Sequence, residues 1–322
     1  MAGSNVVRIR RLGPSAQDLG AAIQGFLSFC QAKNLSPNTL VYYRQRLAAF
    51  ARYVAEHHCE FPLGEITPQI IRGFVAWETD RNSASTANHS YTTLNAFFSY
   101  LVRDGLLDQN PVDRVDKPRR RRAVIGTFSP EEVESILATC RNDFVGVRDR
   151  AIILTLLDCG LRASELCGLR LEDIDWREQT LLVVGKGDRE RVVPFGSAVR
   201  RALGEYIGRR GDLPCRELFV SVYGEPINRH RLRAIVRRRC ESAGIKEVRC
   251  SLHTFRHTFA VMFLRAGADA FTLQKLLGHS DLGMTRRYCE LSRTDVLEKH
   301  RLFSPADRLR SVGPTSGRKR LK

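Results

Sequence analysis

The sequence predicts a mainly α-helical protein with a small antiparallel β-sheet, an α+β fold in two domains. Three observations lead to this prediction. Helix start signals and helical spacing of apolar residues recur through the first third of the chain, a proline- and arginine-rich stretch interrupts it near residue 120, and a short hairpin pattern follows. A chain of 322 residues is also long enough for two hydrophobic cores.

Residues 15–105 carry helical signals throughout and are expected to form a small all-helical domain after an unstructured basic stretch, residues 1–14. Ser36-Pro37 and Thr67-Pro68 each place a capping hydroxyl before a proline that suits the first helical position. A further helix is predicted from Thr86 to Arg103, because the apolar residues there share one face: Leu94, Phe97, Phe98 and Leu101.

Residues 106–126 are predicted to be a basic linker, because they hold two prolines followed by four consecutive arginines: Arg119, Arg120, Arg121 and Arg122. Such a run is either a solvated charge cluster or a strap along a phosphate backbone. The rest of the chain favours the strap.

A second domain is expected over residues 127–305, followed by a basic, disordered tail over residues 306–322. The domain opens at Ser129-Pro130, where a glutamate three residues after the serine completes a capping box. The strand patterns run from Thr180 to Val184 and from Arg191 to Pro194, with a hairpin tip between them. After the hairpin the chain returns to helices.

One of these later helices is predicted at residues 229–239 and carries an arginine at every fourth position on one face: Arg229, Arg233 and Arg237. Cations at that spacing can follow a phosphate strand of DNA. The same pattern is also typical of a solvated helix face, and the sequence leaves both interpretations open.

The charge balance points to a polyanionic partner. Lys and Arg number 52 against 35 Asp and Glu, a net charge of +17, so nucleic acid is the first candidate. Charge alone also fits a generic basic surface, or a ribosome or membrane-surface binder.

The nine cysteines contain no C-x-x-C pair and are interpreted as buried packing residues, Cys289 included. Without a membrane-length apolar run or a signal-peptide core, the protein is expected in the cytoplasm, at the bacterial nucleoid.

Cutting a phosphodiester without a metal needs cations for the non-bridging oxygens, a nucleophile and a general acid. The sequence lacks H-E-x-x-H, C-x-x-C and Walker-loop motifs, so we expect no metal and no cofactor. Arg162 follows an apolar run at a glycine break, where it is expected to be partly buried with Glu165 as its partner. An ordinary structural ion pair would give the same pattern.

Further polar residues could complete such a site. His253 and Arg256 lie three apart, which places them on one face of a helix, although this spacing is common in surface pairs. Lys186 at the hairpin tip is either a solvated turn residue or a proton donor that reaches into a groove. Tyr288 lies beside paired arginines, shortly after a Gly-His pair that ends in His279.

The complete ordered set of these residues resembles the tyrosine recombinases, also called the phage integrase family, and most of all its compact Xer-like members. The resemblance covers nearly the whole chain. It implies a first catalytic arginine (Arg162) with an acidic supporter (Glu165), a hairpin lysine as general acid (Lys186), the H-x-x-R pair (His253 and Arg256), a second histidine (His279) and a nucleophile (Tyr288).

The resemblance implies a site-specific DNA recombinase that attacks a backbone phosphorus and leaves a 3′-phosphotyrosine and a free 5′ hydroxyl. It also implies a C-shaped clamp on double-stranded DNA, made of a helical SAM-like core-binding domain and a catalytic domain. Members assemble as tetramers on two DNA sites through a C-terminal helix, for which residues 295–303 are the candidate. Chromosome-dimer resolution and transposon, integron or phage integration all remain open.

Two rival functions are weighed against recombination. A type IB topoisomerase-like enzyme shares the chemistry but relaxes supercoils as a monomer, and the candidate docking segment argues against it. A DNA-binding protein with a vestigial active site is disfavoured by the full set of catalytic residue types.

Overall fold

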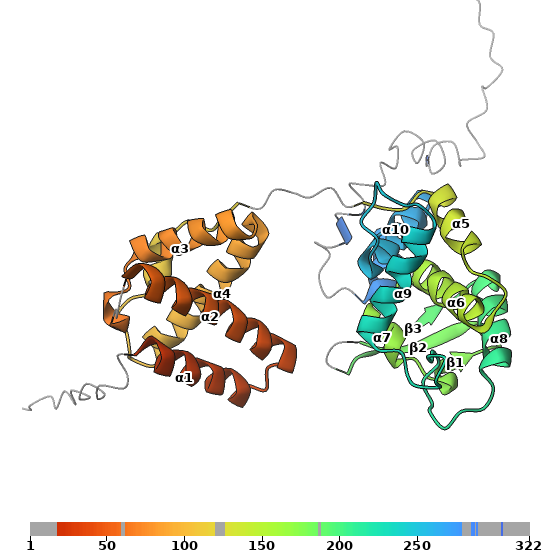
Figure 1. Ribbon diagram of the computed structural model, residues 1–322, viewed down its shortest axis with the longest axis horizontal. Coiled ribbons are helices and arrows are strands. Elements are labelled where there is room, and N and C mark those ends of the chain that lie inside the picture. The colour runs from red at the N-terminus through yellow and green to blue at the C-terminus, as the bar shows by residue number, and fades with distance from the viewer. Residues whose placement is uncertain are drawn as a thin grey trace, which may run out of the picture. The chain divides into compact units, whose positions relative to one another are not determined.

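The computed structural model describes residues 18–58, 62–119, 126–185 and 188–278, together with residues 285, 286, 288 and 304. The chain divides into two compact units, residues 1–123 and residues 124–322 (Figure 1). The described part is mostly helical with one small sheet, so the predicted α+β fold class is confirmed.

The N-terminal unit contains four α-helices within its described residues: α1 (Leu19–Ala32), α2 (Pro37–His58), α3 (Pro68–Arg81) and α4 (Ala84–Arg103). The start signals at Ser36-Pro37 and Thr67-Pro68 are confirmed, because α2 and α3 begin at those prolines. Helix α4 begins two residues before its predicted start, since Ser83 serves as the N-cap and accepts a hydrogen bond from the backbone of Thr86.

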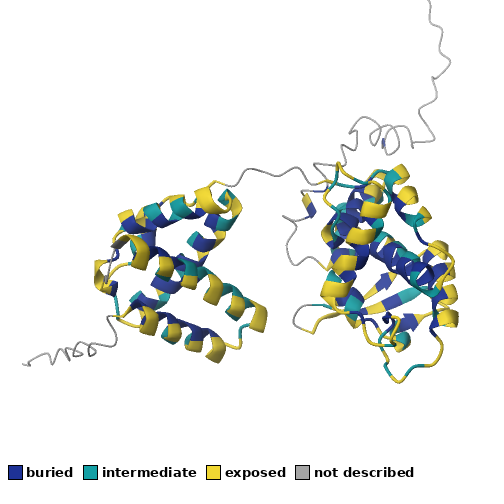
Figure 2. Cartoon of the chain, in the orientation of Figure 1, coloured by how far each residue is buried: buried dark blue, intermediate teal, exposed yellow. Residues whose placement is uncertain are grey.

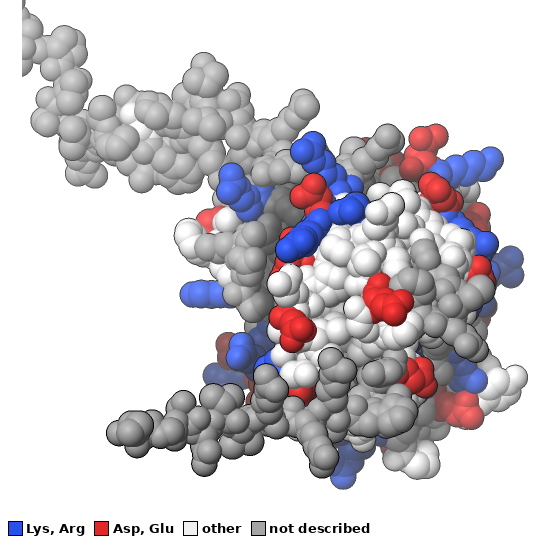
Figure 3. Space-filling model, turned by 90° about the vertical axis from the view of Figure 1, so that its left-hand side faces the viewer, with Lys and Arg blue, Asp and Glu red and all other residues white. Residues whose placement is uncertain are grey.

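Aromatic side chains fill the core of this unit. Phe50 meets Phe74 and Phe98 edge to face, with ring centroids 5.1 and 6.1 Å apart, an arrangement that adds to the gain from burying the rings. Figure 2 shows the buried residues on the inward faces of the four helices. On the face of this unit that Figure 3 shows, acidic and basic side chains are interspersed among uncharged ones.

The first half of the predicted linker, residues 106–126, packs against this unit. A short 3-10 helix, Pro111–Arg114, buries Val112, and Val115 follows it into the same core. Tyr91 donates a hydrogen bond to the carbonyl of Val115, and Asn88 donates one to the carbonyl of Pro118. These interactions join residues 24 and 30 positions apart, beyond the reach of local patterns.

The C-terminal unit contains a three-stranded antiparallel sheet in the order β1-β2-β3, with one face buried and the other exposed. Its described elements are α5 (Pro130–Ala138), α6 (Phe144–Cys159), α7 (Ala163–Gly168), β1 (Ile174–Asp175), β2 (Thr180–Val184), β3 (Glu190–Pro194), α8 (Ser197–Arg210), α9 (Arg229–Ser242), α10 (Leu252–Arg265) and α11 (Ala270–Leu277). Strand β2 has its predicted bounds, β3 begins one residue early, and the two-residue β1 is too short for a periodic pattern.

Helix α6 forms the centre of the second core and is covered by α8, α9 and α10 (Figure 1). A helix enclosed in this way is apolar around most of its surface, as the buried Ile152, Ile153 and Leu156 show. One charged residue of α6 is also fully buried. The carboxylate of Asp149 accepts hydrogen bonds from Arg148, Arg238 and Arg239, and thereby fixes α9 to α6.

The described cysteines agree with the packing interpretation, although Cys289 lies outside the described residues. Cys30, Cys140, Cys159 and Cys240 are buried, and none of the described cysteines forms a disulfide. Burial strongly raises the pKa of the Cys159 thiol, which keeps it protonated. None of the helices in the described part of the chain is long and apolar enough to cross a membrane.

Candidate active site

Segments far apart in the sequence meet around the carboxylate of Glu165, whose side chain is only 1% exposed. Arg162 donates to Oε1 through Nη1 at 2.8 Å and to Oε2 through its backbone N–H at 2.7 Å. Arg191 donates to Oε1 and Oε2 at 2.8 and 2.9 Å. Nη1 of Arg256 lies 4.0 Å from Oε2. The expected pairing of Arg162 with Glu165 is therefore present, within a larger cluster.

The turn between α6 and α7 places Arg162 in this cluster. Helix α6 ends at Cys159, and its C-cap Gly160 has a φ of 58°, a left-handed conformation that glycine adopts without steric cost. A Cβ at this position would lie 2.3 Å from the ring of Phe259, so glycine is also required by close packing. Two residues later, Arg162 is the N-cap of α7, and Glu165 in the first turn reaches back to its backbone.

Arg256 reaches the cluster from α10 and is 4% exposed. Its Nη1 donates to the carbonyl of Gly160 at 2.6 Å, and its Nη2 donates to the carbonyl of Leu277 at 2.7 Å. Burial and the neighbouring charge of Arg162 lower the pKa of Arg256 to about 10, which leaves it protonated at neutral pH.

Glu165 stays ionised in spite of its burial. Desolvation alone would raise the pKa of this carboxyl, but hydrogen bonds from Arg191 and from the backbone and side chain of Arg162, with the charge of Arg191, lower it to about 2. The cluster thus contains one carboxylate and three guanidinium groups at any physiological pH.

His253 stands at the start of α10, one turn before His257, with ring centroids 6.4 Å apart. Desolvation lowers the pKa of His253, and the charges of Arg256 and Arg233 lower it further. The imidazole is therefore neutral at pH 7 and can accept a proton.

Tyr288 is 1% exposed and packs among apolar residues of α10 and α11: Phe259, Ala260, Val261, Leu264, Leu273 and Leu277. Its Oη lies 2.7 Å from Nδ1 of His257, within hydrogen-bonding distance. His257 is not among the site residues predicted from the sequence. Its position four residues after His253 on the same helix is the signal that could have found it.

Lys186 and His279 lie outside the described residues, but the residues next to each of them lie at the cluster. A Cβ on Gly185 would be 3.8 Å from Oε1 of Glu165. The carbonyl of Gly278 accepts a hydrogen bond from Nη2 of Arg162 at 3.2 Å. The hairpin and the end of α11 therefore both reach the site.

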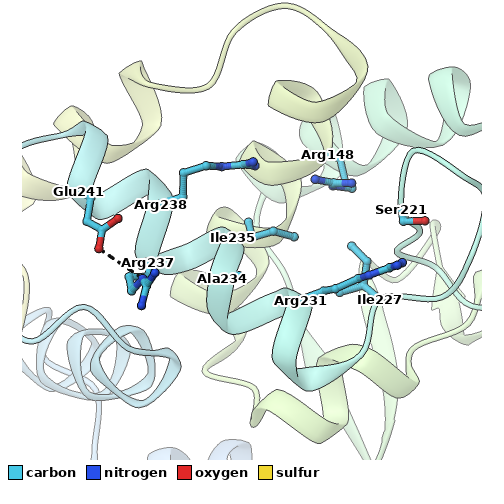
Figure 4. Close-up of a pocket in the computed structure, with 9 residues that line it drawn as sticks. All are labelled: Arg148, Ser221, Ile227, Arg231, Ala234, Ile235, Arg237, Arg238 and Glu241. Atoms are coloured by element: carbon cyan, nitrogen blue, oxygen red, sulfur yellow. Dashed lines mark ion pairs between the residues drawn. The ribbon is translucent and has the colours of Figure 1, made fainter.

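The arginines predicted to bind DNA lie in different surroundings. Arg229, Arg233 and Arg237 are all exposed on α9, and Arg233 is close enough to His253 to affect its pKa. Arg237 instead forms an ion pair with Glu241 at 3.3 Å, beside a pocket of about 480 Å³ that Arg231 and Arg238 also line (Figure 4). Arg119 is exposed, whereas Arg120, Arg121 and Arg122 lie outside the described residues.

Comparison with known proteins agrees with this fold. Residues 127–294 match the phage integrase family, and residues 23–105 match the phage integrase N-terminal SAM-like domain. Tyrosine recombinase XerC of Pelobacter propionicus is 34% identical over 86% of this chain and 92% of its own length. Tyrosine recombinase XerD of Pseudomonas putida is 35% identical over 85% of this chain and 93% of its own.

Solved structures with the same fold include XerH site-specific recombinase bound to a palindromic difH substrate, with a TM-score of 0.76 at 19% identity over 93% of this chain and 99% of that one. A λ integrase dimer bound to a COC′ core site gives a TM-score of 0.70 at 19% identity over 83% and 96% of the two chains. At such identities these likenesses concern the fold alone. Together with the sequence matches, this fold defines a protein of the site-specific recombinase class. The chain belongs to the phage integrase family and is a tyrosine recombinase.

Proposed function

We propose that this recombinase cuts and rejoins double-stranded DNA at a specific site, with Tyr288 as the nucleophile. The observation that carries the proposal is the convergence of Arg162 and Arg256 on Glu165 from segments almost 100 residues apart, beside the residues that adjoin Lys186 and His279. A carboxylate with three guanidinium groups also joins α9 to α6 at Asp149, so the position beside the segments of Lys186 and His279 is what distinguishes the cluster at Glu165.

The guanidinium groups supply electrostatic stabilisation. In the transition state the two non-bridging oxygens of the scissile phosphate are charged, and planar guanidinium forks match them. Arg162 keeps about a third of its side chain exposed, so it can meet a phosphate while Glu165 holds it in place. Arg256 is held by two backbone carbonyls, which fixes its direction before the substrate arrives.

The covalent step forms a bond between the phenolic oxygen of Tyr288 and phosphorus, and breaks the bond from phosphorus to the 5′ oxygen. The phenol gives up its proton, and Lys186 protonates the departing oxygen. The reverse attack by a 5′ hydroxyl on the 3′-phosphotyrosine reseals the strand, so the bond energy is conserved. His279 completes the set of groups that stabilise the transition state.

The proton of Tyr288 has two candidate acceptors. The family resemblance assigns it to His253, which is neutral at pH 7. In the structure Nδ1 of His257 lies at hydrogen-bonding distance from the phenol. Because a buried phenol is out of reach of a phosphate, Tyr288 must leave this position to attack, and His253 is the next imidazole along the same helix face.

The partners we propose are a duplex with a recombination site and further copies of this chain, which assemble as a tetramer on two sites through residues 295–303. That segment lies outside the described residues. Because the proposed substrate is DNA, we expect the protein to act at the bacterial nucleoid. Arg229 and Arg233 support a DNA contact near the site, because they are exposed on the helix whose Arg233 acts on His253.

Covalent trapping tests the proposal. The substrate is a nicked duplex that contains the DNA sequence which the protein protects in a footprint. After cleavage, the short fragment with the free 5′ hydroxyl dissociates and cannot attack the phosphotyrosine. The protein therefore remains attached to the 3′ end. We expect the wild-type protein to form this adduct and Tyr288→Phe to form none while it retains DNA affinity. An adduct on the Phe variant would show that another residue is the nucleophile. A two-site exchange assay beside supercoil relaxation separates recombination from topoisomerase activity.

A further inference from the structure

Arg191 has no role in the reaction described above, yet its side chain forms several hydrogen bonds within the cluster. It lies on β3 opposite Val183 of β2, and its side chain is 13% exposed. Nη1 and Nη2 bind the two oxygens of Glu165, and Nε donates to the carbonyl of Leu276 at 2.8 Å. All three nitrogen atoms are therefore engaged within the protein.

These contacts connect the segments that carry the predicted catalytic residues. Through β3, Arg191 belongs to the hairpin that bears Lys186, and through Glu165 it is tied to the turn that bears Arg162. Through Leu276 it holds the end of α11, just before His279. A Cβ on Gly278 would lie 3.3 Å from the Arg191 side chain, so the backbone passes directly against the guanidinium.

The charges of the cluster explain why Glu165 needs Arg191 as a further partner. Glu165 is needed to orient Arg162, but its negative charge also offsets the attraction of Arg162 and Arg256 for a phosphate. With Arg191 present, three guanidinium groups face one carboxylate, which leaves an excess of two positive charges. That excess matches the two charged non-bridging oxygens of the transition state.

We infer that Arg191 is a positioning residue of the reaction, which neutralises and fixes Glu165 so that Arg162 and Arg256 present their full charge to the scissile phosphate. It acts through Glu165 and does not touch the DNA itself. The inference rests on the proposed function, because it assigns Arg162 and Arg256 to the phosphate.

The test compares the rate of covalent trapping with DNA affinity on the nicked duplex described above. Misplacement of a group at a reacting centre costs up to about 100-fold, so we expect Arg191→Met to slow trapping by about 10- to 100-fold. Affinity should change by no more than about twofold, since Arg191 makes no phosphate contact. Arg191→Lys keeps the charge but loses the two-pronged geometry, and its rate should fall between those of the Met variant and the wild type.

Arg239 provides a matched control for stability. Its side chain is 12% exposed and, like Arg191, it binds a buried carboxylate, that of Asp149. Arg239→Met should lower the melting temperature about as much as Arg191→Met and leave the trapping rate of the folded protein within about twofold of wild type. If the two variants slow trapping equally, the effect of Arg191 is only structural and the inference fails.

A double variant tests whether Arg191 acts through Glu165. If it does, Glu165→Gln combined with Arg191→Met should trap no more slowly than the slower single variant, because both changes disrupt the same unit. If the rate losses of the two single variants multiply in the double variant, Arg191 acts independently of Glu165 and the inference is wrong. Wild-type trapping at a normal rate confirms the activity in every series, so its absence would refute the proposed function separately from the role of Arg191.

Discussion

Gly160 offers a sharp test of how the fold builds the site. An alanine there would have to adopt a φ of 58°, and its Cβ would lie 2.3 Å from the ring of Phe259 and 2.9 Å from Leu277. The left-handed conformation costs about 1–2 kcal/mol and overpacking about 1–3 kcal/mol more. We therefore expect Gly160→Ala to lower the free energy of unfolding of the C-terminal unit by about 2–5 kcal/mol.

The same substitution should also slow covalent trapping, because the carbonyl of Gly160 accepts a hydrogen bond from Arg256 and the turn positions Arg162. The chain supplies a matched control. Gly204 is exposed on α8, and a Cβ there meets no atom within 4 Å. Gly204→Ala should raise the free energy of unfolding by up to about 1 kcal/mol, since alanine favours a helix interior.

Unfolding of the C-terminal unit can be followed by fluorescence. The chain has two tryptophans, Trp77 in the N-terminal unit and Trp176 in the C-terminal unit, so Trp77→Phe leaves Trp176 as the reporter. Urea titrations of the two glycine variants in this background give the free energies directly. If Gly160→Ala unfolds within about 0.5 kcal/mol of its parent, the turn relaxes freely and our account of how it positions Arg162 is wrong.

Two further predictions concern the buried carboxylates. The pKa of Glu165 lies near 2, below its ordinary value of 4.5, so its contribution of about 3 kcal/mol is present above pH 4.5 and is lost as the pH falls toward 2. Glu165→Gln should remove this part of the pH dependence of unfolding, and an unchanged slope would contradict the assignment. Asp149→Asn should destabilise the C-terminal unit by about 3–5 kcal/mol, because it leaves Arg148 buried without a counter-charge. The exposed Asp104, paired with Arg103 at 3.8 Å, is the control, and Asp104→Asn should cost less than about 1 kcal/mol by thermal melting.

Local signals explain which parts of the fold could be predicted. The serine or threonine before proline at residues 36, 67 and 129 acts within one helical turn, and α2, α3 and α5 begin at the prolines that follow. Strand β2 likewise has its predicted bounds, since its strand-favouring residues form one run of five in the sequence. Strand β1 has only two residues and no such run, so pairing with β2 alone defines it.

The ordered polar residues identified the kind of chemistry from sequence, because each residue type is tied to a function that only a few side chains can perform. The sequence by itself therefore determined the class of reaction and the helical architecture. The tertiary structure decided which groups meet. Arg191 binds Glu165 across 26 residues and Leu276 across 85, and His257 approaches Tyr288 across 31. Contacts over such separations arise from the packing of whole helices and strands, and no periodic pattern along the chain encodes them.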